Sequence, residues 1–147
     1  MLEFIKQSWV FPVLQSVHII GLVLLVGTIS LVDFRLLGIA LRNHSAEDLA
    51  SRLSRWTLGA LLTVLITGPL LFGSDLSRYL KNPAFILKMV LLAVALAAHF
   101  TIHRSMLSGN IRMKPSTQKL VAILSLILWS SVVLAGRAIA DFDIRST

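Results

Sequence analysis

PAFILKMVLLAVALAAHFTIH, residues 83–103, is a run of about 20 mostly apolar residues, which is long enough to cross a bilayer as an α-helix. It nevertheless contains three ionisable residues, Lys88, His99 and His103. At about 100° per residue, these three fall on one side of the helix together with Ala95. Ionisable groups in hydrocarbon cost about 2.5–3.5 kcal/mol each on insertion scales, so they are usually turned inward and serve a site. The stretch therefore predicts a membrane span with one polar face.

The composition of the whole chain is that of an integral membrane protein. Hydrophobic residues make up 56% of the 147 residues and charged residues 14%, against about 25% charged in soluble domains. The chain has no cysteine, which excludes disulfides and thiolate sites. Its net charge of +7 suits contact with anionic lipid, whereas nucleic-acid binding would require a soluble basic module that is absent. No Ser/His/Asp arrangement or phosphate-binding glycine loop is present, so hydrolase and nucleotide-binding functions lack support.

Four apolar runs of spanning length predict an all-α fold, a four-transmembrane-helix bundle that forms a single integral membrane domain over residues 1–147. The expected spans are residues 11–32, 56–72, 83–103 and 120–139. The first helix is expected to continue beyond the membrane to Arg42. Ser45 with Asp48 three residues later predicts the start of a short amphipathic helix that precedes the second span.

Basic residues indicate the orientation in the membrane. Four spans place both termini on the same side. Eight of the 14 basic residues follow the first and third spans, before the next span begins. The positive-inside rule then places these two connections in the cytoplasm and both termini in the periplasm. We therefore expect a multi-pass protein of the bacterial inner (cytoplasmic) membrane.

The first span also carries a polar stripe, on which Gln15, His18 and Asp33 share one face. Because the helix rise is about 1.5 Å per residue, depth can be compared between spans. Two polar levels result. The outer level holds His18, Lys88 and Arg137, and the inner level holds Asp33, Arg35, His99 and His103.

Haem b is the first candidate ligand of this polar interior. Imidazoles on facing transmembrane helices are its usual axial ligands, and basic side chains pair with its propionates. His18 is the expected first ligand, and His99 or His103 its partner, so that the haem lies between the first and third spans. Lys88 and Arg137 are the cations expected to neutralise the propionates.

Geometry leaves the second haem ligand open. His18 and His99 differ in depth by roughly 13 Å along the helix axes, whereas opposed axial ligands lie at one level. Tilt of about 20° removes part of this difference, and Met89, near the level of His18, offers a His/Met pair instead. Trp129 is a further candidate for contact with the macrocycle, although a tryptophan is more often a core residue.

A metal-ion site and purely structural contacts are the alternatives. His99 and His103 stand at i, i+4, so both imidazoles can reach one copper or zinc ion, with Asp33 as a third ligand. His18 is the remaining candidate metal ligand. In the structural alternative the polar residues fix helix register, and long basic side chains extend outward to the membrane surface.

Three strings resemble an uncharacterised family of small bacterial four-helix inner-membrane proteins. They are HIIGLVLLVGTISLVDFRLLG at 18–38, NPAFILK at 82–88 and LWSSVVLAGRAIA at 128–140. The recurrent features match His18, Gly21, Gly27, Asp33, Arg35, Phe85, Lys88, His103, Trp129, Gly136 and Arg137, whereas His99 does not match one. The resemblance implies no established activity. The helix count and histidines are similar to those of b-type membrane cytochromes and, more loosely, of copper-resistance membrane proteins.

The sequence thus predicts a membrane electron-transfer protein of the b-type cytochrome kind, which exchanges electrons with quinol and with a periplasmic or membrane redox partner. As an enzyme it would be a quinone-linked oxidoreductase. Asp33 and Arg35 would shape its cytoplasmic end as a quinone or proton site. The alternative is a non-redox membrane protein, either a copper or zinc conduit or an accessory subunit of a membrane complex. A small-residue ridge in the second span would serve the bundle or a homo-oligomer.

Overall fold

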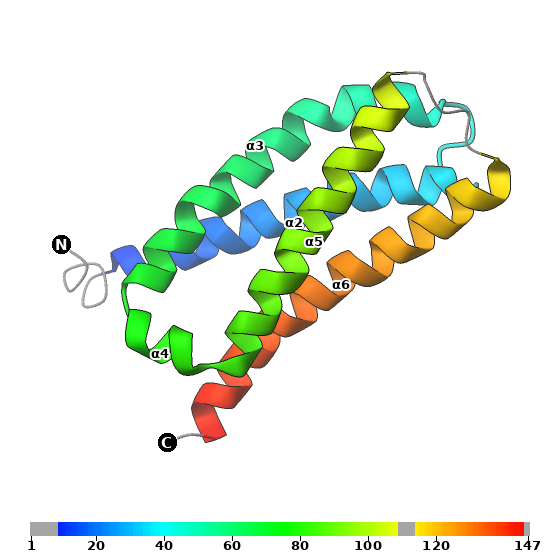
Figure 1. Cartoon of the computed structure of the whole chain (residues 1–147). Helices are drawn as coiled ribbons and strands as arrows, with labels where there is room; N and C mark the ends of the chain where they lie inside the picture. The colour runs from blue at the N-terminus through cyan, green and yellow to red at the C-terminus, as the bar shows by residue number, and fades with distance from the viewer. Residues whose placement is uncertain (1–8, 109–113, 146–147) are drawn as a thin grey trace. The chain divides into compact units, whose positions relative to one another are not determined.

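The computed structural model describes residues 9–108 and 114–145, and every regular element in these ranges is a helix. The helices are α2 (Val10–Leu36), α3 (Ala46–Gly73), α4 (Leu76–Lys81), α5 (Pro83–Leu107) and α6 (Pro115–Arg145) (Figure 1). The predicted all-α class is therefore confirmed.

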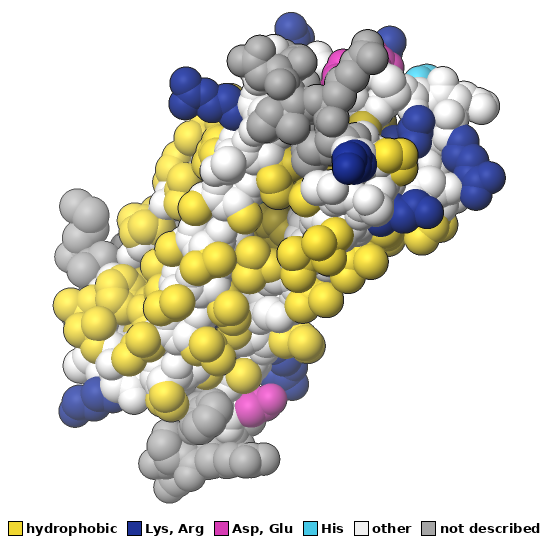
Figure 2. Space-filling model, turned by 45° about the vertical axis from the view of Figure 1, so that its right-hand side comes forward, with side chains coloured by type: hydrophobic (Ala, Val, Ile, Leu, Met, Phe, Trp, Pro, Cys, Tyr) yellow, Lys and Arg dark blue, Asp and Glu magenta, His cyan; other side chains and the backbone are white. Residues whose placement is uncertain are grey.

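Four of these helices are long and apolar enough to cross a membrane. Their spanning parts are Val10–Leu36, Ala46–Gly73, Pro83–Ser105 and Pro115–Ile139, with mean hydropathies of 2.2, 1.7, 2.2 and 2.0. Large apolar side chains lie on the outside of these helices, as at Val23 (65% exposed) and Leu134 (67%). Figure 2 shows apolar side chains along the middle of the helices and Lys and Arg toward their ends. Such surfaces suit hydrocarbon rather than water, and the four predicted spans are confirmed.

The end of α2 differs from the prediction that this helix continues to Arg42. It ends at Leu36, and the backbone turns at Gly38, whose φ of +74° lies in the left-handed region where a side chain is disfavoured. The Gly38 N–H donates to the Arg35 carbonyl at 3.0 Å, which closes the last turn. The Arg42 Nε donates to the Gly38 carbonyl at 2.6 Å and ties the following loop to this end.

The start of α3 confirms one prediction and corrects another. The Ser45 hydroxyl accepts a hydrogen bond from the Asp48 N–H at 3.0 Å, as predicted for the residue that caps the helix. The predicted amphipathic helix is not a short separate helix, because a single helix runs from Ala46 to Gly73. No glycine or proline interrupts the chain between Ser45 and Gly59, so nothing in this stretch stops the helix.

Contacts within the chain divide it into two compact units. Unit 1 comprises Met1–Ile29 and Leu53–Lys81, and unit 2 comprises Ser30–Arg52 and Asn82–Thr147. The two long helices α2 and α3 each contribute to both units. Whether the chain acts as a single domain stays a prediction.

In unit 1, α2 packs closely against α3. A Cβ atom added at Gly21 would lie 3.0 Å from Thr63 Cγ2 and 3.2 Å from Val64 Cγ2, so the absence of a side chain permits this approach. Two turns further along α2, the Thr57 hydroxyl donates to the Thr28 hydroxyl at 2.9 Å. Because residue numbers rise along α2 while those of their partners on α3 fall, the two helices run antiparallel.

In unit 2, α5 and α6 pack antiparallel. Asn82 caps the start of α5, since its Oδ1 accepts the Ala84 N–H at 3.0 Å and its φ and ψ are those of extended backbone. Its Nδ2 donates to the Ile139 carbonyl of α6 at 3.2 Å. The last turn of α2 joins this unit through an apolar cluster in which Leu36 and Ala122 are buried.

The close approach at Gly21 gives a stability prediction. Replacing Gly21 by valine should lower the free energy of unfolding by about 1–3 kcal/mol, because the new side chain overpacks the contact with Thr63 and Val64. Gly27→Val is the matched control, since an added Cβ there meets nothing within 4 Å. Thermal unfolding of the purified variants in detergent measures the difference. Equal melting temperatures for the two variants would contradict tight packing at Gly21.

The predicted orientation can be tested by thiol labelling, because the chain contains no cysteine. Ser77→Cys, on the connection between the second and third spans, should react with a membrane-impermeant maleimide in intact bacterial cells. Asn43→Cys, on the first connection, should react only after the inner membrane is permeabilised, because basic connections stay in the cytoplasm. The opposite pattern would invert the orientation.

Candidate functional site

His18 lies on α2 in unit 1 and is held by α3. Its Nδ1 is 2.7 Å from the Thr67 hydroxyl oxygen, and that hydroxyl donates to the Thr63 carbonyl at 2.6 Å. If the hydroxyl proton is directed to the Thr63 carbonyl, the imidazole donates through Nδ1. The lone pair of the neutral ring is then on Nε2, the nitrogen that would bind a metal. The contact with Thr67 therefore fixes the orientation of His18 and favours this tautomer.

The sequence of α3 makes room for this imidazole. A Cβ added at Gly68 would lie 3.5 Å from the His18 Cε1 atom, at ordinary van der Waals contact, so the imidazole lies directly against this part of α3. Thr67 is buried, with 6% of its surface exposed. In the sequence, Thr67 stands out only as part of the small-residue ridge of the second span, with Gly59 and Thr63. A threonine at this spacing places a hydroxyl group as well as a small side chain at the contact between the helices. This hydroxyl is the feature of the sequence that indicates its role.

Lys88 lies against α6 in unit 2. Its Cε and Nζ atoms are each 3.5 Å from the position that a Cβ on Gly136 would occupy, so the lysine side chain lies along α6 at this residue. The side chain is half-buried. Within residues 9–108 and 114–145, its ammonium group has no hydrogen-bond or ion-pair partner. A cation at this depth in a span is costly unless an anion or water accompanies it.

Asp33 is the buried carboxylate of unit 2. It is 5% exposed, and Ser125 of α6 forms a side-chain hydrogen bond with it. Its Oδ2 atom is buried and has no hydrogen-bond partner among the described residues. At Asp33, the predicted polar face of the first span is therefore turned inward, toward α6.

His99 and His103 are neighbours on α5, also in unit 2. Their ring centroids are 5.7 Å apart at 39°, and the His99 ring meets Phe100 edge-on with centroids 5.8 Å apart. In the part of the chain that the structure describes, no group of three or more His, Cys, Asp or Glu side chains is arranged to hold a metal ion. Asp33 therefore does not join these two imidazoles as the predicted third ligand.

Three further predicted site residues have other surroundings. The Arg137 Nη1 lies 3.4 Å from Asp141 Oδ1, and the arginine side chain is 71% exposed, so this cation is turned outward. The Arg35 Nε donates to the His44 carbonyl and fixes the loop after α2. Trp129 is 2% exposed and is a core residue of unit 2; its contact with a cofactor stays a prediction.

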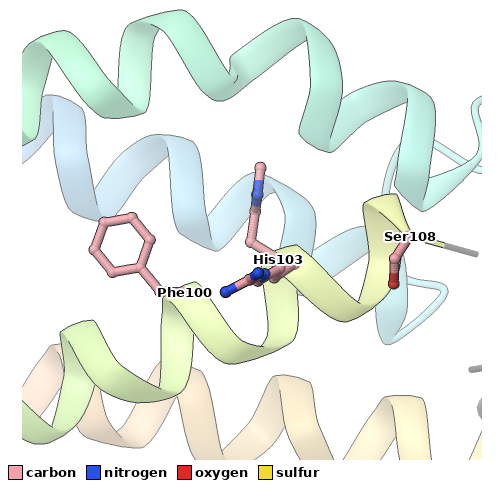
Figure 3. A pocket seen from close by; sticks show the side chains of 4 residues that line it. Phe100, His103 and Ser108 are labelled. Atoms are coloured by element: carbon pink, nitrogen blue, oxygen red, sulfur yellow. The ribbon is translucent and has the colours of Figure 1, made fainter. Parts of the chain in front are cut away.

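A hollow of about 660 Å³ lies along the last two turns of α5 (Figure 3). It is lined by Phe100, His103, Arg104 and Ser108. These residues are spaced at three and four positions, so they share one face of the helix. The sequence does not predict this hollow, because the hollow depends on which side of the helix is left uncovered by its neighbours.

These features define a multi-pass membrane protein with polar side chains between its helices. Residues 8–142 match the model of a family described as a family of unknown function (DUF6644), and the chain belongs to this family. No curated protein and no solved structure matches the chain. The predicted membership of an uncharacterised family is thus confirmed, whereas the likeness to b-type cytochromes stays a prediction.

The contact between Asp33 and Ser125 gives a second stability prediction. Ser125→Ala should cost about 1–3 kcal/mol of unfolding free energy, because the buried carboxylate loses a hydrogen-bond donor. Ser131→Ala is the control, since the Ser131 hydroxyl bonds only within its own helix, to the Ile127 carbonyl at 2.8 Å. Thermal unfolding in detergent compares the two. A loss in Ser125→Ala no larger than in the control would contradict this account.

Proposed function

We propose that this protein is a membrane electron-transfer protein of the b-type cytochrome kind, in which His18 is an axial ligand of haem b. The observation that carries the proposal is the hydrogen bond from His18 Nδ1 to Thr67. Histidines that bind metals almost always donate the other ring N–H to a neighbouring acceptor, which fixes the ring and raises the basicity of the binding nitrogen. His18 has this arrangement inside a membrane span.

Donor number favours haem over a bare metal ion. A copper or zinc ion needs three or four protein ligands, and the described residues include no such group. Haem iron is already held by the porphyrin nitrogens and needs only axial ligands from the protein. One well-oriented histidine with a second donor is therefore sufficient for haem.

The sequence also assigns Lys88 to this cofactor. Haem brings two carboxylates into a low-dielectric interior, and a lysine ammonium group in a span would neutralise one of them. Haem supplies one-electron redox chemistry, while the protein holds and tunes it. Quinol is the proposed electron donor because it dissolves in the bilayer. The second ligand, His99 or His103, and the redox partner remain predictions from the sequence.

The absorption spectrum tests the proposal. Protein produced with a haem precursor and purified in detergent should have a Soret band that shifts on dithionite reduction. His18→Ala should abolish or greatly weaken that band. Separate His99→Ala and His103→Ala variants should identify the second ligand, since only one of them should change the spectrum. A colourless protein would overturn the proposal, and stoichiometric copper or zinc in it would instead favour the metal-binding alternative.

Thr67 provides a sharper test of the hydrogen bond on which the proposal rests. Thr67→Val keeps the shape of the side chain but removes the acceptor for His18 Nδ1, so haem affinity should fall by about 10–100-fold. Thr101→Val is the matched control, because the Thr101 hydroxyl is exposed and bonds only to the Ala97 carbonyl of its own helix. Haem titration of the apo-proteins measures both. Equal affinities in the two variants would show that the Thr67 contact does not prepare His18 for iron.

A further inference from the structure

Along α5, the hollow has an aromatic ring at its deeper end and polar side chains toward the end of the helix. The sequence predicts the third span at residues 83–103, so Phe100 lies within it, His103 and Arg104 at its end, and Ser108 beyond it. Figure 3 shows Phe100, His103 and Ser108 in this order along α5. From Phe100 to Ser108 the helix rises about 12 Å. The hollow therefore crosses from the hydrocarbon to the headgroup region of a bilayer.

Arg104 is the charged group of the hollow. Its side chain is exposed, and among the described residues its guanidinium has no hydrogen-bond or ion-pair partner. A guanidinium presents several N–H donors in a plane that matches the oxygens of a phosphate. The neighbouring His103 imidazole, also on the wall, offers a further hydrogen-bonding nitrogen. The end of a helix carries partial negative charge that disfavours anions, but a full positive charge in direct contact outweighs it.

The exposed ring of Phe100 gives the hollow an apolar part in addition to its cationic part. It is 53% exposed and one turn deeper than Arg104, where a free phosphate would gain nothing from an aromatic ring. A phospholipid has the matching order of groups, with a phosphate near the surface and an acyl chain below it. The Ser108 hydroxyl is engaged with the Ser105 carbonyl at 3.2 Å, so it forms the rim rather than a phosphate donor.

We propose that this hollow binds the headgroup phosphate of an anionic phospholipid, with Arg104 and His103 on the phosphate and an acyl chain against Phe100. Arg104 and Phe100 have no part in the proposed haem site, and binding of the phosphate by His103 requires that His99 be the second haem ligand. Its position at the end of the third span, next to a basic connection, matches the leaflet in which anionic lipids attract basic side chains.

Native mass spectrometry of the full chain in detergent tests the proposal. Wild-type protein should bind phosphatidylglycerol in preference to phosphatidylcholine with the same acyl chains. Arg104→Gln should weaken phosphatidylglycerol binding by about tenfold, the loss expected for a hydrogen bond to a charged group. Arg52→Gln is the matched control, because it removes the same charge from an exposed arginine that pairs with Asp48 at 3.0 Å and does not line the hollow.

Two further measurements distinguish a lipid phosphate from free inorganic phosphate as the ligand of the hollow. Phe100→Ala should weaken lipid binding while leaving any binding of inorganic phosphate unchanged, and it gives an independent reading if Arg104→Gln does not fold. Inorganic phosphate that competes as well as the lipid does would assign a free anion and overturn the lipid proposal. Equal losses of phosphatidylglycerol binding in Arg104→Gln and Arg52→Gln would assign the binding to general surface charge and overturn the proposal. The absence of any preference for phosphatidylglycerol over phosphatidylcholine would also overturn it.

Discussion

Hydrocarbon offers no hydrogen-bond partner to a polar side chain, and this constraint shapes every polar contact between the helices. His18 bonds to Thr67, Thr28 to Thr57, and the Asn82 amide to the Ile139 carbonyl. Each bond joins two helices that apolar packing alone would leave free to slide, because lipid tails are as apolar as leucine. The polar pairs therefore fix which residues face one another, and small residues such as Gly21 permit the helices to approach closely enough for these bonds to form.

Lys88 and Asp33 are the exceptions that point to function. Within the described residues, the lysine ammonium and one carboxylate oxygen of the aspartate lack partners inside a membrane protein. Apolar residues of similar volume often make a protein more stable than buried charges do. Ionisable groups inside membrane spans are therefore the positions at which a ligand, a proton or an ion is first to be sought.

Periodicity was sufficient to predict the four spans and the inward face of the first helix, where Leu25, Ile29 and Asp33 are all buried. It was not sufficient for the end of α2, which depends on the left-handed backbone of Gly38, nor for the continuity of α3. Arg137 is exposed and pairs with Asp141, which stands four residues later. This spacing is visible in the sequence, but the prediction considered only residues inside the spans and therefore placed Arg137 in the interior. The contact of His18 with Thr67 depends on helix register, which one sequence does not supply.

Helix α6 runs to Arg145, six residues past residue 139, where the apolar run that predicts the fourth span ends. At about 1.5 Å per residue this is roughly 9 Å of helix beyond that run. A soluble helical protein joined in register to this extension would move with the membrane-embedded part as one rod. Such a fusion would supply the alignment marker that electron microscopy of a 147-residue membrane protein needs, without altering any residue that lies between the spans.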